Sequence, residues 1–105
     1  MPTLFFEIAI NLNNLGALKH AQRKLDEAEP LYWRALAIKE KLLGDEHPDV
    51  AITLNNLAVL LRLRGKPGEA TELFRRALAI YETTLDPNHP KLLACRSNYE
   101  RCRTS

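Results

Sequence analysis

The feature that most constrains this chain is a repeat with a period of 42 residues. Three separate blocks recur at this offset: Leu-Asn-Asn-Leu at 12–15 and 54–57, Arg-Ala-Leu-Ala-Ile at 34–38 and 76–80, and His-Pro at 47–48 and 89–90. Aligned without gaps, segments 11–52 and 53–94 share about 18 identities in 42 positions. A fixed period of this length is typical of solenoids, in which similar units stack in a row.

Each unit reads as a pair of helices. In the second unit the apolar residues recur every three or four positions, which is the spacing of a buried helix face. The first stripe is Leu54, Leu57, Ala58 and Leu61, and the second is Ala70, Leu73, Phe74, Ala77, Leu78, Tyr81 and Leu85. Between the stripes, Gly65 can end one helix in a left-handed conformation and Pro67 can begin the next. The connection is short, so the two helices must be antiparallel.

The pairs are joined by longer segments, 44–49 and 86–91, which place Pro48 and Pro90 where helices should start. A fifth helix is expected from about Pro90 to Cys102, and its polar residues Arg96, Glu100 and Arg103 suit a cap on the stack. We therefore predict an all-α fold, a right-handed α-solenoid of antiparallel hairpins in a single domain over residues 1–105. Repeat 1 should span about 4–44, repeat 2 about 47–86, and a partial repeat or capping helix about 90–103.

The small and large residues of both units resemble the tetratricopeptide repeat. Leu54, Leu57 and Ala58 followed by Ala70, Phe74 and Ala77 fit that pattern, as do Leu12, Leu15 and Gly16 followed by Ala28, Tyr32 and Ala35. Ala58, Gly16, Ala70 and Ala28 should be small because a neighbouring helix sits against them. The 42-residue period and the His-Pro connection are similar to the repeats of kinesin light chain. Two departures are the period itself, since 34 is usual, and Lys19 and Leu61 in place of the usual aromatic residue.

The resemblance implies a scaffold that binds a peptide or protein partner. In this family the first helix of each hairpin lines the concave side of the stack. The implied peptide-binding residues are Asn13, Asn14, Ala17, His20, Asn55, Asn56, Val59, Arg62, Asn98 and Arg101. Asn14, Asn56 and Asn98 should form a ladder, because they recur at the same period. An asparagine amide both donates and accepts hydrogen bonds. In the alternative, structural interpretation, these asparagines bond to the neighbouring hairpin and fix its angle.

Other functions find little support in the sequence. The formal net charge of +2 is too small to indicate a nucleic-acid partner, and no run approaches the roughly 18 apolar residues of a membrane span. Cys95 and Cys102 lie seven positions apart on one predicted helix, too far to bridge, so we expect free thiols and a cytoplasmic location. We interpret His47 and His89 as supports of a helix start rather than metal ligands.

No catalytic constellation is present in the sequence, so we expect no enzyme and no cofactor. Gly65-x-x-Gly68 reads as a plain turn and not as a phosphate loop, and Glu72 should pair with Arg76 one helical turn later. The alternative function is a structural self-association module. Leu4, Phe5, Phe6 and Ile8 form an apolar start that a second copy can cover, giving a dimer or filament. Trp33 would cover a hairpin edge or serve a contact between chains, and the short length indicates a piece of a longer array.

Overall fold

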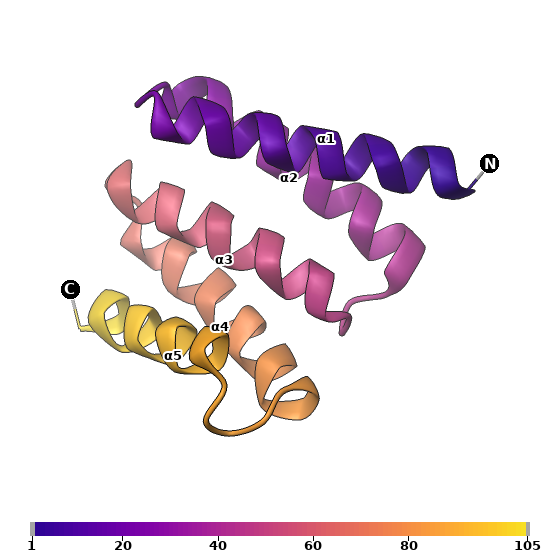
Figure 1. Ribbon diagram of the computed structural model, residues 1–105. Coiled ribbons are helices and arrows are strands. Elements are labelled where there is room, and N and C mark those ends of the chain that lie inside the picture. Colours follow the sequence, from indigo (N-terminus) through magenta and orange to yellow (C-terminus); the bar gives the residue numbers. More distant parts are fainter. Residues whose placement is uncertain (1, 105) are drawn as a thin grey trace.

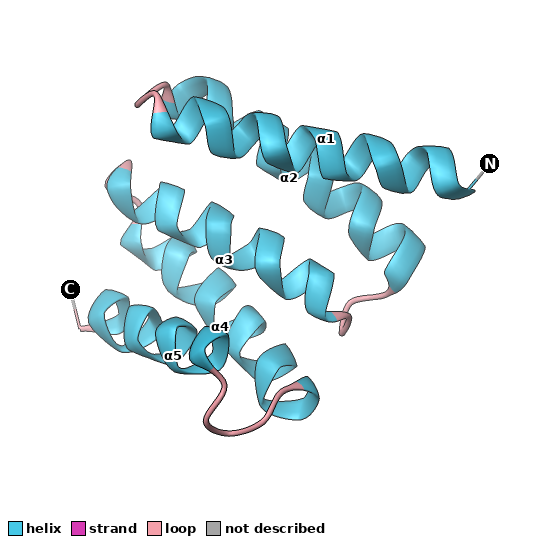
Figure 2. Ribbon diagram, viewed as in Figure 1, coloured by secondary structure: helices cyan, strands magenta, loops and turns pink. Residues whose placement is uncertain are grey.

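The computed structural model describes residues 2–104 as five helices joined by short loops. They are α1 (Pro2–Ala21), α2 (Leu25–Leu43), α3 (Pro48–Leu63), α4 (Pro67–Thr84) and α5 (Pro90–Arg103). Over the described residues all regular structure is helical (Figure 2). The predicted all-α fold is confirmed.

The helices form two antiparallel hairpins and a final single helix. Helix α1 packs against α2 and α3 against α4, and α5 packs on α4 (Figure 1). Helices α1, α3 and α5 form the layer nearer the viewer in Figure 1, and α2 and α4 form the layer behind it. This arrangement confirms the predicted helical-repeat solenoid, with two hairpins followed by a fifth helix.

Proline and histidine together set the starts of α3 and α5. The ring nitrogen Nδ1 of His47 accepts a hydrogen bond from the backbone N–H of Asp49 at 3.0 Å, and Nδ1 of His89 accepts one from Lys91 at 3.1 Å. The first N–H groups of a helix lack a partner within the helix, and a side-chain acceptor satisfies one of them. Both histidines therefore support a helix start, as predicted.

The two hairpin turns have the same backbone shape but different residues. Gly65 has φ +78°, and the next residue, Lys66, donates its N–H to the carbonyl of Leu61 at 2.9 Å. Arg23 stands at the equivalent position 42 residues earlier and also has a positive φ, 64°. Glycine adopts this left-handed region freely, whereas another residue is destabilised there by roughly 1–2 kcal/mol. The first turn is thus strained in a way that the second is not.

Close packing within each hairpin depends on small residues. A Cβ atom added to Gly16 would lie 3.0 Å from the ring of Tyr32. Ala28, Ala58 and Ala70 are each 0% exposed, as predicted for positions against a neighbouring helix. The large partners that fill the space are Tyr32 and Phe74, 2% and 0% exposed. Burying one such aromatic side chain stabilises the fold by about 1.5–3 kcal/mol.

One predicted ion pair is wrong. Glu72 does not pair with Arg76 but with Arg75, whose guanidinium hydrogen-bonds it and holds the pKa of the Glu72 carboxyl below its usual range. Arg76 turns instead toward the first hairpin, where its Nη2 lies 2.7 Å from Oε2 of Glu40 in α2. A pairing rule for a single helix misses this contact, because Glu40 is brought close only by the stacking of hairpins.

Candidate functional site

All ten candidate residues lie on one recurring stripe of helix surface. On α3, whose other faces are largely buried, the stripe consists of partly exposed residues: Ile52, Asn55, Asn56, Val59 and Arg62. The same positions recur 42 residues earlier on α1 and 42 residues later on α5. The structure therefore places the candidates on the layer formed by α1, α3 and α5 (Figure 1).

Asn13 takes part in the packing of the two hairpins against each other. Its Oδ1 accepts a hydrogen bond from Oγ1 of Thr53 at 3.2 Å, and Thr53 in turn accepts one from Nζ of Lys39 at 3.0 Å. Lys39 and Thr53 are buried, 5% and 0% exposed. Burial lowers the pKa of Lys39, and Asp49 partly opposes this effect. The chain of bonds links α1, α2 and α3, which is the structural role weighed for this asparagine.

Asn55 has the same repeat position as Asn13 but different neighbours. The residues equivalent to Lys39 and Thr53 are Tyr81 and Cys95. The Cys95 thiol points to the carbonyl of Phe74, with its Sγ 3.7 Å from that oxygen. Within residues 2–104, the buried Oδ1 of Asn55 has no hydrogen-bond partner. A buried acceptor that stays unpaired costs about 1–3 kcal/mol.

A recess of about 190 Å³ lies beside the two asparagines of α3. Its lining residues come from three helices: Ile52, Asn55, Asn56, Tyr81, Lys91 and Ala94. The sequence pattern located the two asparagines but not Tyr81 or Lys91. Tyr81 is only 3% exposed, and its burial, with smaller contributions from Cys95 and Asp49, raises its pKa to about 12. The sequence pattern placed Tyr81 in the buried stripe of its helix but did not indicate that it also borders this recess.

The remaining candidates on α1 and α3 differ in their exposure and in their contacts. Asn14 and Ala17 are exposed on α1, and Val59 packs partly against the core. His20 meets the ring of Tyr32 edge-on at 6.5 Å, and burial, then the charge of Arg23, lowers its pKa.

The candidates at the other end of the stripe contact each other. Nη2 of Arg101 donates to Oδ1 of Asn98 at 2.8 Å. Together with Arg62 and Lys91 they place cationic and amide groups along one face, which suits a ligand rich in hydrogen-bond acceptors.

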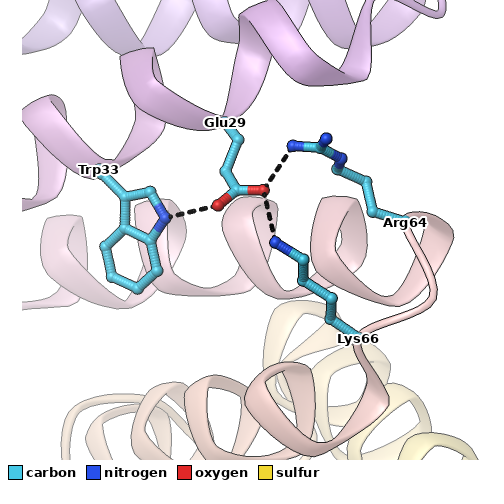
Figure 3. Close-up of polar contacts among 4 residues, drawn as sticks. All are labelled: Glu29, Trp33, Arg64 and Lys66. Atoms are coloured by element: carbon cyan, nitrogen blue, oxygen red, sulfur yellow. Dashed lines mark hydrogen bonds and ion pairs between the residues drawn. The ribbon is translucent and has the colours of Figure 1, made fainter.

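Trp33 lies on α2, in the opposite layer. Its Nε1 donates to Oε2 of Glu29 at 3.1 Å, and Oε1 of Glu29 lies 2.8 Å from Arg64 and 3.7 Å from Lys66 (Figure 3). Arg64 and Lys66 belong to the connection between α3 and α4, so Glu29 joins the first hairpin to the second. The Trp33 side chain itself remains 40% exposed.

Reactive groups are not gathered in the described chain. Cys95 and Cys102 are free and buried, and burial, then the charge of Glu82, raises the pKa of Cys95 to about 11. A buried neutral thiol is a poor nucleophile. Residues 2–104 hold no group of three metal-ligating side chains. None of the described helices has the length and apolar character needed to cross a bilayer.

Known proteins share both the sequence pattern and the fold. The pattern of the tetratricopeptide repeat family matches residues 7–83. A nucleotide-binding leucine-rich repeat (NLR)-like protein from Hyaloscypha variabilis is 47% identical over 38 residues, which are 36% of this chain and 4% of that protein.

Two solved structures come from a Podosopora anserina protein assigned as a kinesin light chain with nearly identical tetratricopeptide-like repeats. One is the protein itself and the other is a variant with a single substitution, and their TM-scores are 0.84 and 0.85. Each is 30% identical and covers 90% of this chain, which spans 44% of the solved chain. The chain therefore belongs to the tetratricopeptide repeat family and has repeats of the kinesin light chain type.

Proposed function

We propose that the chain binds an extended segment of a partner protein along the stripe of α1, α3 and α5. Tetratricopeptide folds are scaffolds that generally mediate contacts between proteins. The observation that supports this site is the recess beside Asn55 and Asn56, where two neighbouring amides border a hollow between α3 and α5. We also propose a cytoplasmic location, in keeping with the free thiols.

The amides divide into two kinds by what surrounds them. The oxygen of Asn13 accepts a hydrogen bond from Thr53, so this residue serves the stack. Asn14 and Asn56 are at least partly exposed and repeat at one period, and each amide can donate to and accept from a peptide backbone laid across the helices. Asn55 stands between the two kinds, since it borders the recess and its buried oxygen is unpaired within residues 2–104.

Charged side chains then give selectivity. Arg62, Lys91 and Arg101 all lie on this layer, and each is at least partly exposed. A ligand carbonyl or carboxylate can accept hydrogen bonds from them, and charge-assisted bonds are stronger than neutral ones. The apolar walls of the recess, Ile52 and Ala94, leave room for one small apolar side chain of the ligand.

The test begins with peptides selected on the wild-type chain from a phage-displayed random library. Replacing both Asn55 and Asn56 with alanine should weaken binding of the selected peptides about tenfold or more, since two hydrogen bonds are lost. Asn88→Ala is the matched control, because Asn88 is exposed in the loop before α5. Far-UV circular dichroism verifies that helicity is unchanged. Full-strength binding by the folded double variant would refute this site.

A further inference from the structure

An open hollow lies between α2 and the start of α4, on the layer opposite to the amide stripe (Figure 1). Its volume is about 420 Å³, and both of its walls belong to the two described hairpins. Five residues line it: Trp33, Gly68, Glu69, Glu72 and Leu73. We call this site the Trp33 hollow.

The indole of Trp33 is exposed and yet held in one orientation. Its Nε1 donates to Glu29, which is held in turn by Arg64 and Lys66. In Figure 3 the six-membered ring points away from that carboxylate and from both cations. A side chain that is already fixed loses little conformational freedom when a partner covers it, and tryptophan is enriched among the residues that dominate binding energy.

The repeat itself does not require an aromatic residue at position 33. The equivalent residue on α4 is Arg75, which is exposed. The large aromatic side chain that fills the hairpin core is Tyr32 in the first repeat and Phe74 in the second. Trp33 therefore takes no part in the packing that the two repeats have in common, and its exposed ring is available to a partner.

Gly68 leaves the backbone of α4 bare at the edge of the hollow. It lies in the first turn of α4 without a positive φ, and an added Cβ atom would meet nothing within 4 Å. Neither the backbone conformation nor packing within the chain calls for glycine here, although alanine is the better helix former. A glycine does allow another chain to approach the backbone closely.

The charges at the hollow favour a cationic ligand. Two of the five lining residues, Glu69 and Glu72, are carboxylates, and none of the five is basic. Glu72 is bound by Arg75, whereas Glu69 is exposed and has no ion-pair partner within residues 2–104. Glu69 also complements the positive end of α4, so the helix start does not call for an anion. A purely apolar side chain would take water from this carboxylate without replacing it.

An arginine side chain matches each wall of the hollow. The flat face of a guanidinium stacks on an indole ring, and its edge donates two hydrogen bonds to one carboxylate. The methylene groups of the side chain contact apolar surface, which Leu73 and the Trp33 ring provide here. The ammonium of lysine is compact and strongly hydrated, so it matches the same walls less well.

We propose that the Trp33 hollow binds an arginine side chain from a basic segment of a partner protein, with the guanidinium between the Trp33 ring and the Glu69 carboxylate. The hollow shares no residue with the amide stripe, so this binding does not depend on the peptide site proposed above. One chain then holds two partner segments, one on each layer.

The test uses peptides selected from a phage-displayed random library on the Asn55→Ala, Asn56→Ala double variant, which lacks two amides of the stripe. We expect the selected peptides to contain arginine. Those without tryptophan should change the fluorescence of Trp33, the single tryptophan of the chain. Replacing the peptide arginine with citrulline, which is neutral and similar in shape, should weaken binding about tenfold or more. Lysine in its place should give an intermediate affinity.

Variants of the protein locate the binding, measured by the fluorescence anisotropy of labelled peptides. Trp33→Leu and Glu69→Gln should each weaken binding about tenfold, and both should remain folded because these side chains are exposed. Glu7→Gln is the matched control, since it removes the same charge from an exposed position on α1. It should bind as the parent does.

Three results would overturn the proposal. The first is a selection that yields no peptide able to change the emission of Trp33. The second is equal binding of the arginine and citrulline peptides, or full binding by the folded Trp33→Leu protein. The third is an equal loss in Glu7→Gln and Glu69→Gln, which would show general attraction of charge. Because the selection uses the double variant, none of these results depends on whether the amide stripe binds peptides.

Discussion

Thr53 and Cys95 occupy the same repeat position, yet only Thr53 hydrogen-bonds to the asparagine of the preceding first helix. Its hydroxyl donates to Asn13 Oδ1 at 3.2 Å, whereas the Cys95 thiol turns to the carbonyl of Phe74 at 3.7 Å. The equivalent oxygen, on Asn55, is buried and has no hydrogen-bond partner within residues 2–104. The two junctions between hairpins are therefore alike in shape but not in hydrogen bonding.

The substitution Cys95→Thr should supply the hydrogen bond that Asn55 Oδ1 lacks. A threonine hydroxyl at this position can donate to Asn55 Oδ1 as Thr53 does to Asn13, and one such bond stabilises a protein by about 1 kcal/mol. For a chain of this size the midpoint of thermal unfolding should rise by about 4–8 °C. Urea titration followed by circular dichroism measures the change. The reverse substitution, Thr53→Cys, should lower stability, and a gain from that variant would contradict the explanation.

Sequence alone predicts the helices and their order because the signals that place them are local. Pro48, Pro67 and Pro90 each begin a helix, and Gly65 ends one. These residues act on the backbone of their own turn, so no knowledge of distant contacts is needed. The regular repetition of the blocks then implies that the hairpins stack.

Contacts between hairpins are beyond the reach of the same reasoning. The hydrogen bond from buried Lys39 to Thr53 joins residues 14 positions apart in the sequence. The pairing of Arg76 with Glu40 joins residues 36 positions apart. A charged residue in a helix reads as exposed unless the alignment of repeats is examined for burial. Lys39 aligns with Tyr81, which belongs to the apolar stripe of its own helix. This alignment of the two repeats was the available signal that Lys39 would be buried. For the site, the sequence located the asparagines but not Lys91 or Tyr81 beside them.

Buried Tyr81 should make the chain sensitive to alkali. Its pKa in the folded chain is about 12, above the ordinary value of 10.0, because burial disfavours the phenolate. The contribution of this group to the free energy of unfolding is complete below about pH 10 and is lost as the pH rises to about 12. The reason is that the unfolded chain releases the Tyr81 proton at a lower pH than the folded chain does. At about pH 11 the loss from this one group should be about 1 kcal/mol.

Comparing wild type and Tyr81→Phe isolates that group. Urea unfolding at about pH 8 and about pH 11 should show a smaller loss for the phenylalanine variant, since it has no proton to release. Cys95, with a pKa raised to about 11, acts in the same direction in both proteins and cancels in the comparison. Equal losses in the two proteins would show that the Tyr81 hydroxyl is ordinary in the folded chain.

Glu29 should hold both the hairpin junction and the orientation of Trp33. Replacing Glu29 with alanine removes its contacts to Arg64 and Lys66 and frees the indole N–H. Stability should fall by about 1 kcal/mol, the upper end for a partly exposed pair. Trp33 is the single tryptophan of the chain, so its fluorescence reports the local change directly.

We expect emission at longer wavelength and easier quenching by acrylamide in the Glu29→Ala protein. Glu27→Ala is the matched control on the same helix, because Glu27 pairs only with Lys19, at 3.4 Å, among the contacts described. It should leave the emission unchanged. An identical spectrum for both variants would mean that Glu29 does not orient the ring.

The strained first turn offers a direct way to stabilise the chain. Arg23 has φ 64°, so Arg23→Gly should raise stability by about 0.5–1 kcal/mol, less than the full strain because glycine also gains freedom in the unfolded state. Gly65→Ala should lower stability by about 1 kcal/mol. A Cβ atom at position 65 would meet nothing within 4 Å, so this loss would come from the backbone and not from crowding.

Gly68 separates these two causes. A Cβ atom there also meets nothing within 4 Å, but Gly68 lies in the first turn of α4 with no positive φ. Gly68→Ala should therefore stabilise the chain by about 0.5–1 kcal/mol, opposite in sign to Gly65→Ala. The midpoints of thermal unfolding of Arg23→Gly, Gly65→Ala and Gly68→Ala, each compared with the wild type, test these expectations. If Gly65→Ala and Gly68→Ala change stability in the same direction, the left-handed turn is not what distinguishes the two glycines, and the gain expected from Arg23→Gly loses its basis.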